Sequence, residues 1–301
     1  MTDEEQQDYG EKEYLVHRLL EQVEKTSDFD LSKTKFYKLV CIADRHLKND
    51  LDRDIEFPRY WYQYGEVPWK DGFNTEFFSI ASTGNGYNKV SLVDNLPESA
   101  FNIADDVTQD IERTIQWVVR QFRDDNAEDI EEYHYERHSP TEFVRTFHRF
   151  RGELKSYDPG QATFSSFLSN GNDDQHLDQL QNRLEQLILA YPEEKYDSMY
   201  NLFLRWENTI RLLLDQGDVE SAQDLSRKFW MTICRVELRL HNNQNIPGWK
   251  IENWRRLRNS EKTKFENALE EIREEALANV TQTDELEAIA EPYSETMRES
   301  F

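Results

Sequence analysis

The chain is poor in cysteine, proline and glycine, with 2, 8 and 10 of these residues in 301. Neither Cys41 nor Cys234 belongs to a Cys-x-x-Cys pair, which excludes a zinc knuckle or a dithiol redox motif, and we expect two buried thiols. No run approaches the roughly 18 uncharged apolar residues of a membrane span. The acidic start, Met1-Thr2-Asp3-Glu4-Glu5, is unlike the basic start of a signal peptide, so we expect a cytoplasmic protein without a membrane partner.

Positive charge is also scarce, because 36 basic residues stand against 60 acidic ones and the net charge is −24. This balance argues against non-specific binding to nucleic acid or anionic lipid, which depends on basic patches. An acidic surface stays hydrated in concentrated salt, where its self-repulsion is screened. We interpret the chain as halophilic; the alternative is an ordinary acidic cytoplasmic protein. The aromatic content of 13% argues against disorder throughout.

Catalytic and cofactor motifs are missing as well. There is no Gly-x-Ser-x-Gly, and the Gly-x-Gly of Gly84 and Gly86 lacks the Lys-Ser/Thr of a phosphate loop. His134 and His138 are four residues apart, a spacing that can chelate a metal on a helix, but no His-Glu-x-x-His pattern completes the set. We therefore predict a protein that is not an enzyme and has no cofactor or metal.

Apolar residues recur at helical spacing through most of the chain. Aromatic and β-branched residues at 76–82 and 87–93 flank Thr83-Gly84-Asn85-Gly86, which predicts a β-hairpin. Ser, Gly, Asn and Asp are concentrated in 156–174, the best candidate linker. The expected helices are 11–25, 31–49, 104–124, 126–137, 139–155, 175–190, 193–215, 218–243, 250–279 and 282–298.

The sequence therefore predicts a mainly α fold in two domains. Residues 1–155 would form a helical N-terminal domain with the small β-hairpin at 76–93. Residues 175–301 would form a C-terminal antiparallel helical bundle, because short turns join its long helices. No repeat of fixed period is present, which disfavours a solenoid.

An aromatic run follows the second expected helix, bounded by Pro and Gly. Tyrosine and tryptophan bury large areas, keep a polar group and are enriched at interfaces. The run therefore predicts either core packing beneath the hairpin or a partly exposed recognition surface. Its members are Tyr60, Trp61, Tyr62, Tyr64 and Trp69.

Residues 249–264 are a local exception to the acidity, since six basic residues there stand against two acidic ones, with two tryptophans among them. Such a segment is typical of nucleic-acid binding, and its basic residues can equally pair with acids of a neighbouring helix. The candidate contacts for nucleic acid are Trp254, Arg255, Arg256 and Arg258.

Three segments resemble, in order, motifs of Panacea (SocA-like) domains. Residues 33–44, Lys-Thr-Lys-Phe-Tyr-Lys-Leu-Val-Cys-Ile-Ala-Asp, are similar to the opening helix of that family. Residues 60–68 resemble its aromatic-x-Tyr-Gly-Pro-Val segment, with Glu66 in place of the proline. His138-Ser139-Pro140 resembles its Thr-His-Ser-x-x-Pro-Trp region, without the Thr and the Trp. The resemblance spans about residues 15–150.

This resemblance implies a role, because Panacea domains act mainly as antitoxins that bind small toxins, and related members are protease adaptors. We therefore expect a non-enzymatic protein-binding protein in a toxin–antitoxin or virus–host setting. The aromatic run, with His138 nearby, would contact the partner. A nucleic-acid-binding regulator that uses residues 249–264 is the alternative.

Overall fold

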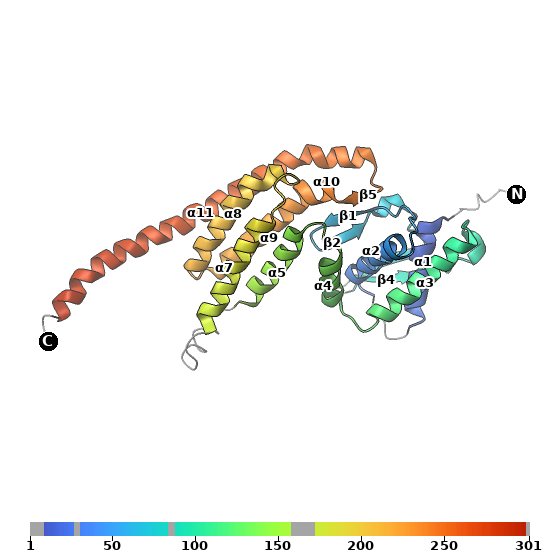
Figure 1. The fold of residues 1–301 in the computed structure, drawn as a ribbon, viewed down its shortest axis with the longest axis horizontal. Coiled ribbons are helices and arrows are strands. Elements are labelled where there is room, and N and C mark those ends of the chain that lie inside the picture. The colour runs from blue at the N-terminus through green and yellow to red at the C-terminus, as the bar shows by residue number, and fades with distance from the viewer. Residues whose placement is uncertain (1–8, 27–30, 84–87, 158–171, 299–301) are drawn as a thin grey trace. The chain divides into compact units, whose positions relative to one another are not determined.

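The computed structural model describes residues 9–26, 31–83, 88–157 and 172–298, and it confirms the mainly α prediction (Figure 1). The chain forms two compact units. The first unit contains residues 1–140 and 238–255, and the second contains 141–237 and 256–301. This division corrects the predicted domains: the helix that ends near 155 belongs to the second unit, and a later segment returns to the first. Most of the predicted linker lies outside the described residues.

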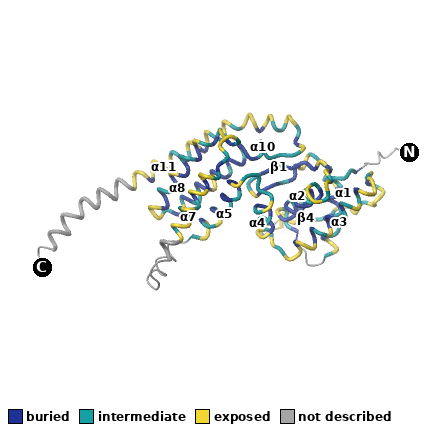
Figure 2. Tube along the Cα trace, in the orientation of Figure 1, coloured by how far each residue is buried: buried dark blue, intermediate teal, exposed yellow. Residues whose placement is uncertain are grey.

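Helices in the first unit follow the apolar periodicity, and their buried faces form one core (Figure 2). Ser32 caps the second helix, because its hydroxyl accepts the Lys35 N–H at 3.1 Å. Cys41 is a buried free thiol, as expected, and so is Cys234 in the second unit. The helices are α1 (Glu11–Glu24), α2 (Lys33–Asp50), α3 (Asp105–Phe122), α4 (Ala127–His138) and the short α10 (Arg239–His241), with 3-10 turns η1 (Lys70–Gly72) and η2 (Glu98–Ala100).

Two small antiparallel sheets complete the first unit. The predicted hairpin is present as β3 (Phe78–Ser82) paired with β4 (Asn88–Leu92), and its tip lies outside the described residues. The second sheet was not predicted and has the order β2-β1-β5. Its strands are β1 (Arg59–Tyr62), β2 (Gly65–Pro68) and β5 (Asn243–Gln244), the last supplied by the segment that returns from the second unit.

The second unit is helical around an aromatic core. The Phe147 ring stacks on Trp230 with centroids 5.0 Å apart, and Trp206 stacks on Phe229 at 4.7 Å. Thr141 caps its first helix, because its hydroxyl accepts the Val144 N–H at 3.3 Å. The two helices predicted at 250–279 and 282–298 are one continuous helix. The elements are α5 (Glu142–Ser156), α7 (Asn172–Ala190), η3 (Asp197–Met199), α8 (Tyr200–Asp215), α9 (Val219–Ile233), the π-helical η4 (Cys234–Leu238) and α11 (Gly248–Arg298), which begins in the first unit.

None of the helices in the described ranges combines the length and apolar character needed to cross a bilayer.

Candidate functional site

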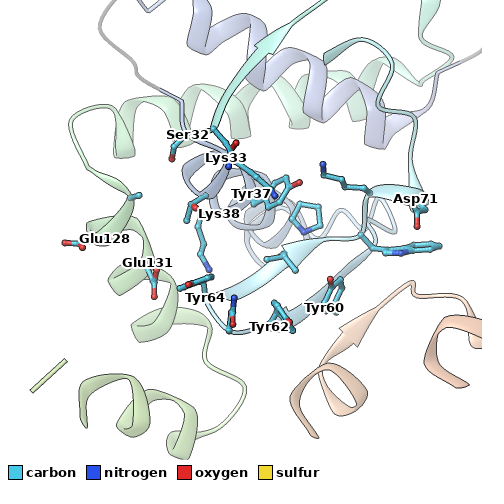
Figure 3. Close-up of a pocket in the computed structure, with 18 of the residues that line it drawn as sticks. Ser32, Lys33, Tyr37, Lys38, Tyr60, Tyr62, Tyr64, Asp71, Glu128 and Glu131 are labelled. Carbon is cyan, nitrogen blue, oxygen red and sulfur yellow. The ribbon is translucent and has the colours of Figure 1, made fainter. Parts of the chain in front are cut away.

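A cavity of about 850 Å³ lies in the first unit, walled by α2, the β1–β2 hairpin and the first turn of α4 (Figure 3). Its volume falls in the range of roughly 300–1,000 Å³ that is usual for ligand sites. We call it the tyrosine pocket, after Tyr60, Tyr62 and Tyr64 on the hairpin wall. Trp69 completes that wall, so four of the five residues in the predicted aromatic run line one cavity.

Alternation along β1 decides which aromatic residues face the pocket. Successive side chains of a strand point to opposite faces of the sheet. Tyr60 and Tyr62 therefore line the pocket, whereas Trp61 is fully buried on the opposite face. Tyr64, in the hairpin turn, is the most open of the group at 51% exposure. The expectation that Trp61 contacts a partner is wrong, because its side chain is part of the core.

The returning segment supports the hairpin wall from outside. Trp69 packs in a small cluster with Ile246 and Trp254, and the Tyr60 ring lies 5.0 Å from the ring of Trp254. The backbone N–H of Trp61 donates to the Asn242 carbonyl at 2.8 Å. Contacts made across nearly two hundred residues of sequence therefore hold the tyrosines in place.

A buried ion network fastens the hairpin to α2. Arg59 binds Asp44 through Nε at 2.6 Å and also pairs with Glu66. Arg45 donates two hydrogen bonds, of 2.6 and 2.7 Å, to the same Glu66 carboxylate. These two guanidinium groups outweigh burial and hold the pKa of Glu66 below its usual value. Glu66, the departure from the Panacea-like segment, is thus a structural anchor.

His134 of α4 lies under the hairpin turn. Its Nε2 accepts the backbone N–H of Glu66 at 3.1 Å, and its ring stacks on Trp61 with centroids 5.3 Å apart. Burial lowers the pKa of His134 well below the usual value, so the ring is neutral near pH 7. Tyr135 completes this support by donating its hydroxyl to the Gln63 carbonyl at 3.2 Å.

His138 does not reach the tyrosine pocket. It lines a separate cavity of about 540 Å³ with His46 and Trp117, whose rings stack at 4.2 Å. Burial, assisted by the charge of Arg45, lowers the pKa of His138 to about 4. Within the described ranges, no group of three or more His, Cys, Asp or Glu residues could hold a metal ion. The structure thus separates His138 from the tyrosines with which it was grouped.

The basic segment 249–264 is largely engaged within the molecule. Arg258 binds both carboxylate oxygens of the fully buried Glu237 at 2.7 and 2.8 Å. Trp254 is 4% exposed, and Arg255 pairs with Glu252 on its own helix. Arg256 is exposed. Pairing with internal acids, the interpretation set beside nucleic-acid binding, therefore accounts for Arg255 and Arg258 but not for Arg256.

Sequence analysis did not single out the lysines of the pocket. Lys33 and Lys38 of α2, Lys70 of η1 and Lys250 of α11 all line it. Lys38 is 1% exposed, and burial lowers its pKa to about 8. The available signal was position: Lys38 occurs among the apolar positions of 31–49, where a lysine on the buried face of a helix is unusual.

Comparisons with known proteins add no relative, since no protein-family model, curated protein or solved structure matches the chain.

Proposed function

We propose that this is a non-enzymatic binding protein that recognises a protein partner through the tyrosine pocket. One observation carries the proposal: the β1–β2 hairpin buries Trp61 and turns Tyr60 and Tyr62 toward a cavity of about 850 Å³. Tyrosine suits such a surface because it contributes a large apolar area and a polar hydroxyl at little cost in side-chain entropy.

The rigidity of the pocket wall supports recognition. Asp44, Arg45, Arg59 and Glu66 fix the hairpin from below, and His134 fixes its turn. A wall held in its bound conformation before the partner arrives avoids part of the ordering cost of association. The network therefore favours a preformed binding surface.

The resemblance to Panacea domains supports the class of partner. The segments that carry it, 33–44 and 60–68, contribute both α2 and the hairpin to the pocket. The partner would be a small toxin, and the protein would act as its antitoxin or as an adaptor in a cytoplasmic defence system. The net charge of −24 supports a salt-rich cell as the setting.

The test is a parallel affinity purification in molar KCl of the wild type, Tyr62→Ala and Tyr64→Ala. Leu189→Ala is the matched control, since Leu189 is 87% exposed and lies outside the pocket. We expect one small protein near equal stoichiometry, with affinity reduced by about 2 kcal/mol in each tyrosine variant and unchanged in the control.

Three results would contradict the proposal. The first is a partner that both tyrosine variants retain, and the second is no partner at all. The third is co-purified nucleic acid, detected by the ratio of absorbance at 260 and 280 nm, which would instead favour the basic segment 249–264.

A further inference from the structure

Lysines that have no ion pair among the described residues line the tyrosine pocket. The ammonium groups of Lys33 and Lys70 each lie 5.7 Å from the centroid of the Tyr37 ring, and Lys250 lines the same cavity. Among the residues that the structure describes, none of these three lysines has an ion pair. In a chain with 60 acidic and 36 basic residues, that lack of partners is unexpected. Arg45 and Arg59, by contrast, each bind a carboxylate nearby.

The pocket wall also holds hydrogen-bonding groups that have no hydrogen-bond partner among the described residues. They are the ammonium of Lys38, the hydroxyl of Tyr37 and the indole N–H of Trp69, all buried and unbonded. A buried donor without a hydrogen-bond partner destabilises the structure that holds it, and a charged donor does so more strongly. These three atoms have almost no exposed surface, so an occupant of the pocket does not touch them directly. The positive charge of Lys38 still lies in the pocket wall, and it favours an acidic occupant over an apolar one.

The ends of two helices reinforce this preference. The first residues of α2 and of α4 line the pocket, and a helix N-terminus carries partial positive charge. Three carboxylates line it as well, Asp71, Glu128 and Glu131. Glu128 and Glu131 lie on α4, across the cavity from Tyr37 (Figure 3). Asp71 follows Lys70 in η1, so one carboxylate lies on the same side of the pocket as Lys70, and the other two lie on α4.

We propose that the tyrosine pocket binds a carboxylate group of the partner beside Tyr37, between Lys33 and Lys70, with an adjoining aromatic side chain against Tyr60 and Tyr62. The occupant is an acidic segment that also carries an aromatic residue. Its identity as part of a protein rests on the proposed function. A volume of about 850 Å³ accommodates two or three such side chains, not a folded domain.

Phenylacetate tests this chemistry in its simplest form, because it joins one carboxylate to one ring. Isothermal titration of the full chain would compare it with phenylacetamide, which has the same shape and no charge. We expect saturable binding of phenylacetate and binding of phenylacetamide that is at least roughly tenfold weaker. Equal binding of the two compounds, or no binding of phenylacetate, would overturn the proposal.

Lysine variants locate the binding. We expect Lys33→Gln with Lys70→Gln to weaken phenylacetate binding by about tenfold, since both charged partners of the carboxylate are removed. Lys262→Gln with Lys264→Gln is the control, because it makes the same change in net charge in the second unit. Circular dichroism would confirm that both double variants fold. Phenylacetate binding that survives the first double substitution would also overturn the proposal.

The two proposals fail separately. If phenylacetate binding depends on the lysines but no protein partner is found, the result would support the carboxylate site and contradict the proposed function. If a protein partner requires Tyr62 and Tyr64 but phenylacetate does not bind, the result would support the recognition surface and contradict the carboxylate site.

Discussion

Trp61 of β1 and Tyr64 of the hairpin turn have opposite environments, so substitution of each should affect stability differently. Trp61 is fully buried against His134 and Tyr135, so Trp61→Ala leaves a large cavity. We expect it to lower the free energy of unfolding by about 3–5 kcal/mol. Tyr64→Ala changes a half-exposed side chain and should lower it by less than about 1 kcal/mol. Urea denaturation followed by circular dichroism measures both, and equal losses would place Trp61 outside the core.

Lys38 is a second residue whose environment opposes its chemistry. Its pKa is about 8 in the folded protein and 10.5 in a free side chain, so the unfolded chain binds more protons between these values. The buried charge therefore has its full destabilising effect below pH 8, and the free energy of unfolding increases as the pH rises from 8 toward 10.5. We expect Lys38→Met to raise the free energy of unfolding at pH 7 by about 1–3 kcal/mol.

The pH dependence distinguishes this cause from better packing. The gain from Lys38→Met should shrink between pH 8 and pH 10, where the wild-type amine becomes neutral. Lys70→Met is the control, because Lys70 is exposed and its charge stays hydrated. Chemical denaturation at the two pH values measures the difference, and a gain independent of pH would contradict the buried-charge explanation.

At the scale of elements, the β1–β2 turn depends on one glycine. Gly65 has φ of +87°, and an added Cβ would lie 2.6 Å from the Lys38 ammonium and 2.7 Å from His134. Gly65→Ala should therefore lower the free energy of unfolding by about 1–3 kcal/mol and displace the tyrosine wall. Gly152→Ala is the matched control: Gly152 lies in α5 with open space around it, and alanine there should stabilise by about 0.5–1 kcal/mol.

The comparison of α2 with β1 shows what local sequence determines. Helical periodicity predicted a helix over 31–49, close to the observed α2, because that signal lies within the segment itself. All four residues of β1 pair with β2, and Arg59 and Tyr60 also pair with β5, which follows them by more than 180 residues. Apolar periodicity could not show the contact with β5, and a strand of four residues is too short for its alternation to indicate which face is buried.

The candidate site could likewise be predicted only in part from the sequence. Composition singled out the tyrosines because they are clustered in sequence, whereas the lysines of the pocket come from α2, η1 and α11. Lys38 and Glu66 become informative only when burial shows one with no hydrogen-bond partner and the other between two arginines. Tertiary contacts, not residue type, gave these groups their properties.

At the scale of the whole molecule, added salt has two opposite effects on stability: it weakens ion pairs, and it screens the repulsion among the excess negative charges. Surface ion pairs such as Lys48–Asp54 weaken on screening, but such pairs contribute only about 0–1 kcal/mol each. Repulsion among the 24 excess negative charges is screened at the same time, as the Debye length falls from about 10 Å at 0.1 M to about 3 Å at 1 M. Repulsion acts on the whole chain, so its relief should dominate.

We therefore expect the midpoint of thermal unfolding to rise between 0.1 M and 1 M KCl. The double variant Glu271→Lys with Glu274→Lys removes four units of negative charge at exposed positions and should rise less over the same interval. Glu271→Asp with Glu274→Asp keeps the charge and should follow the wild type. Because KCl also acts on hydrophobic burial, which none of these substitutions changes, the difference between the two double variants isolates repulsion. Equal rises in all three proteins would assign the salt effect to burial instead.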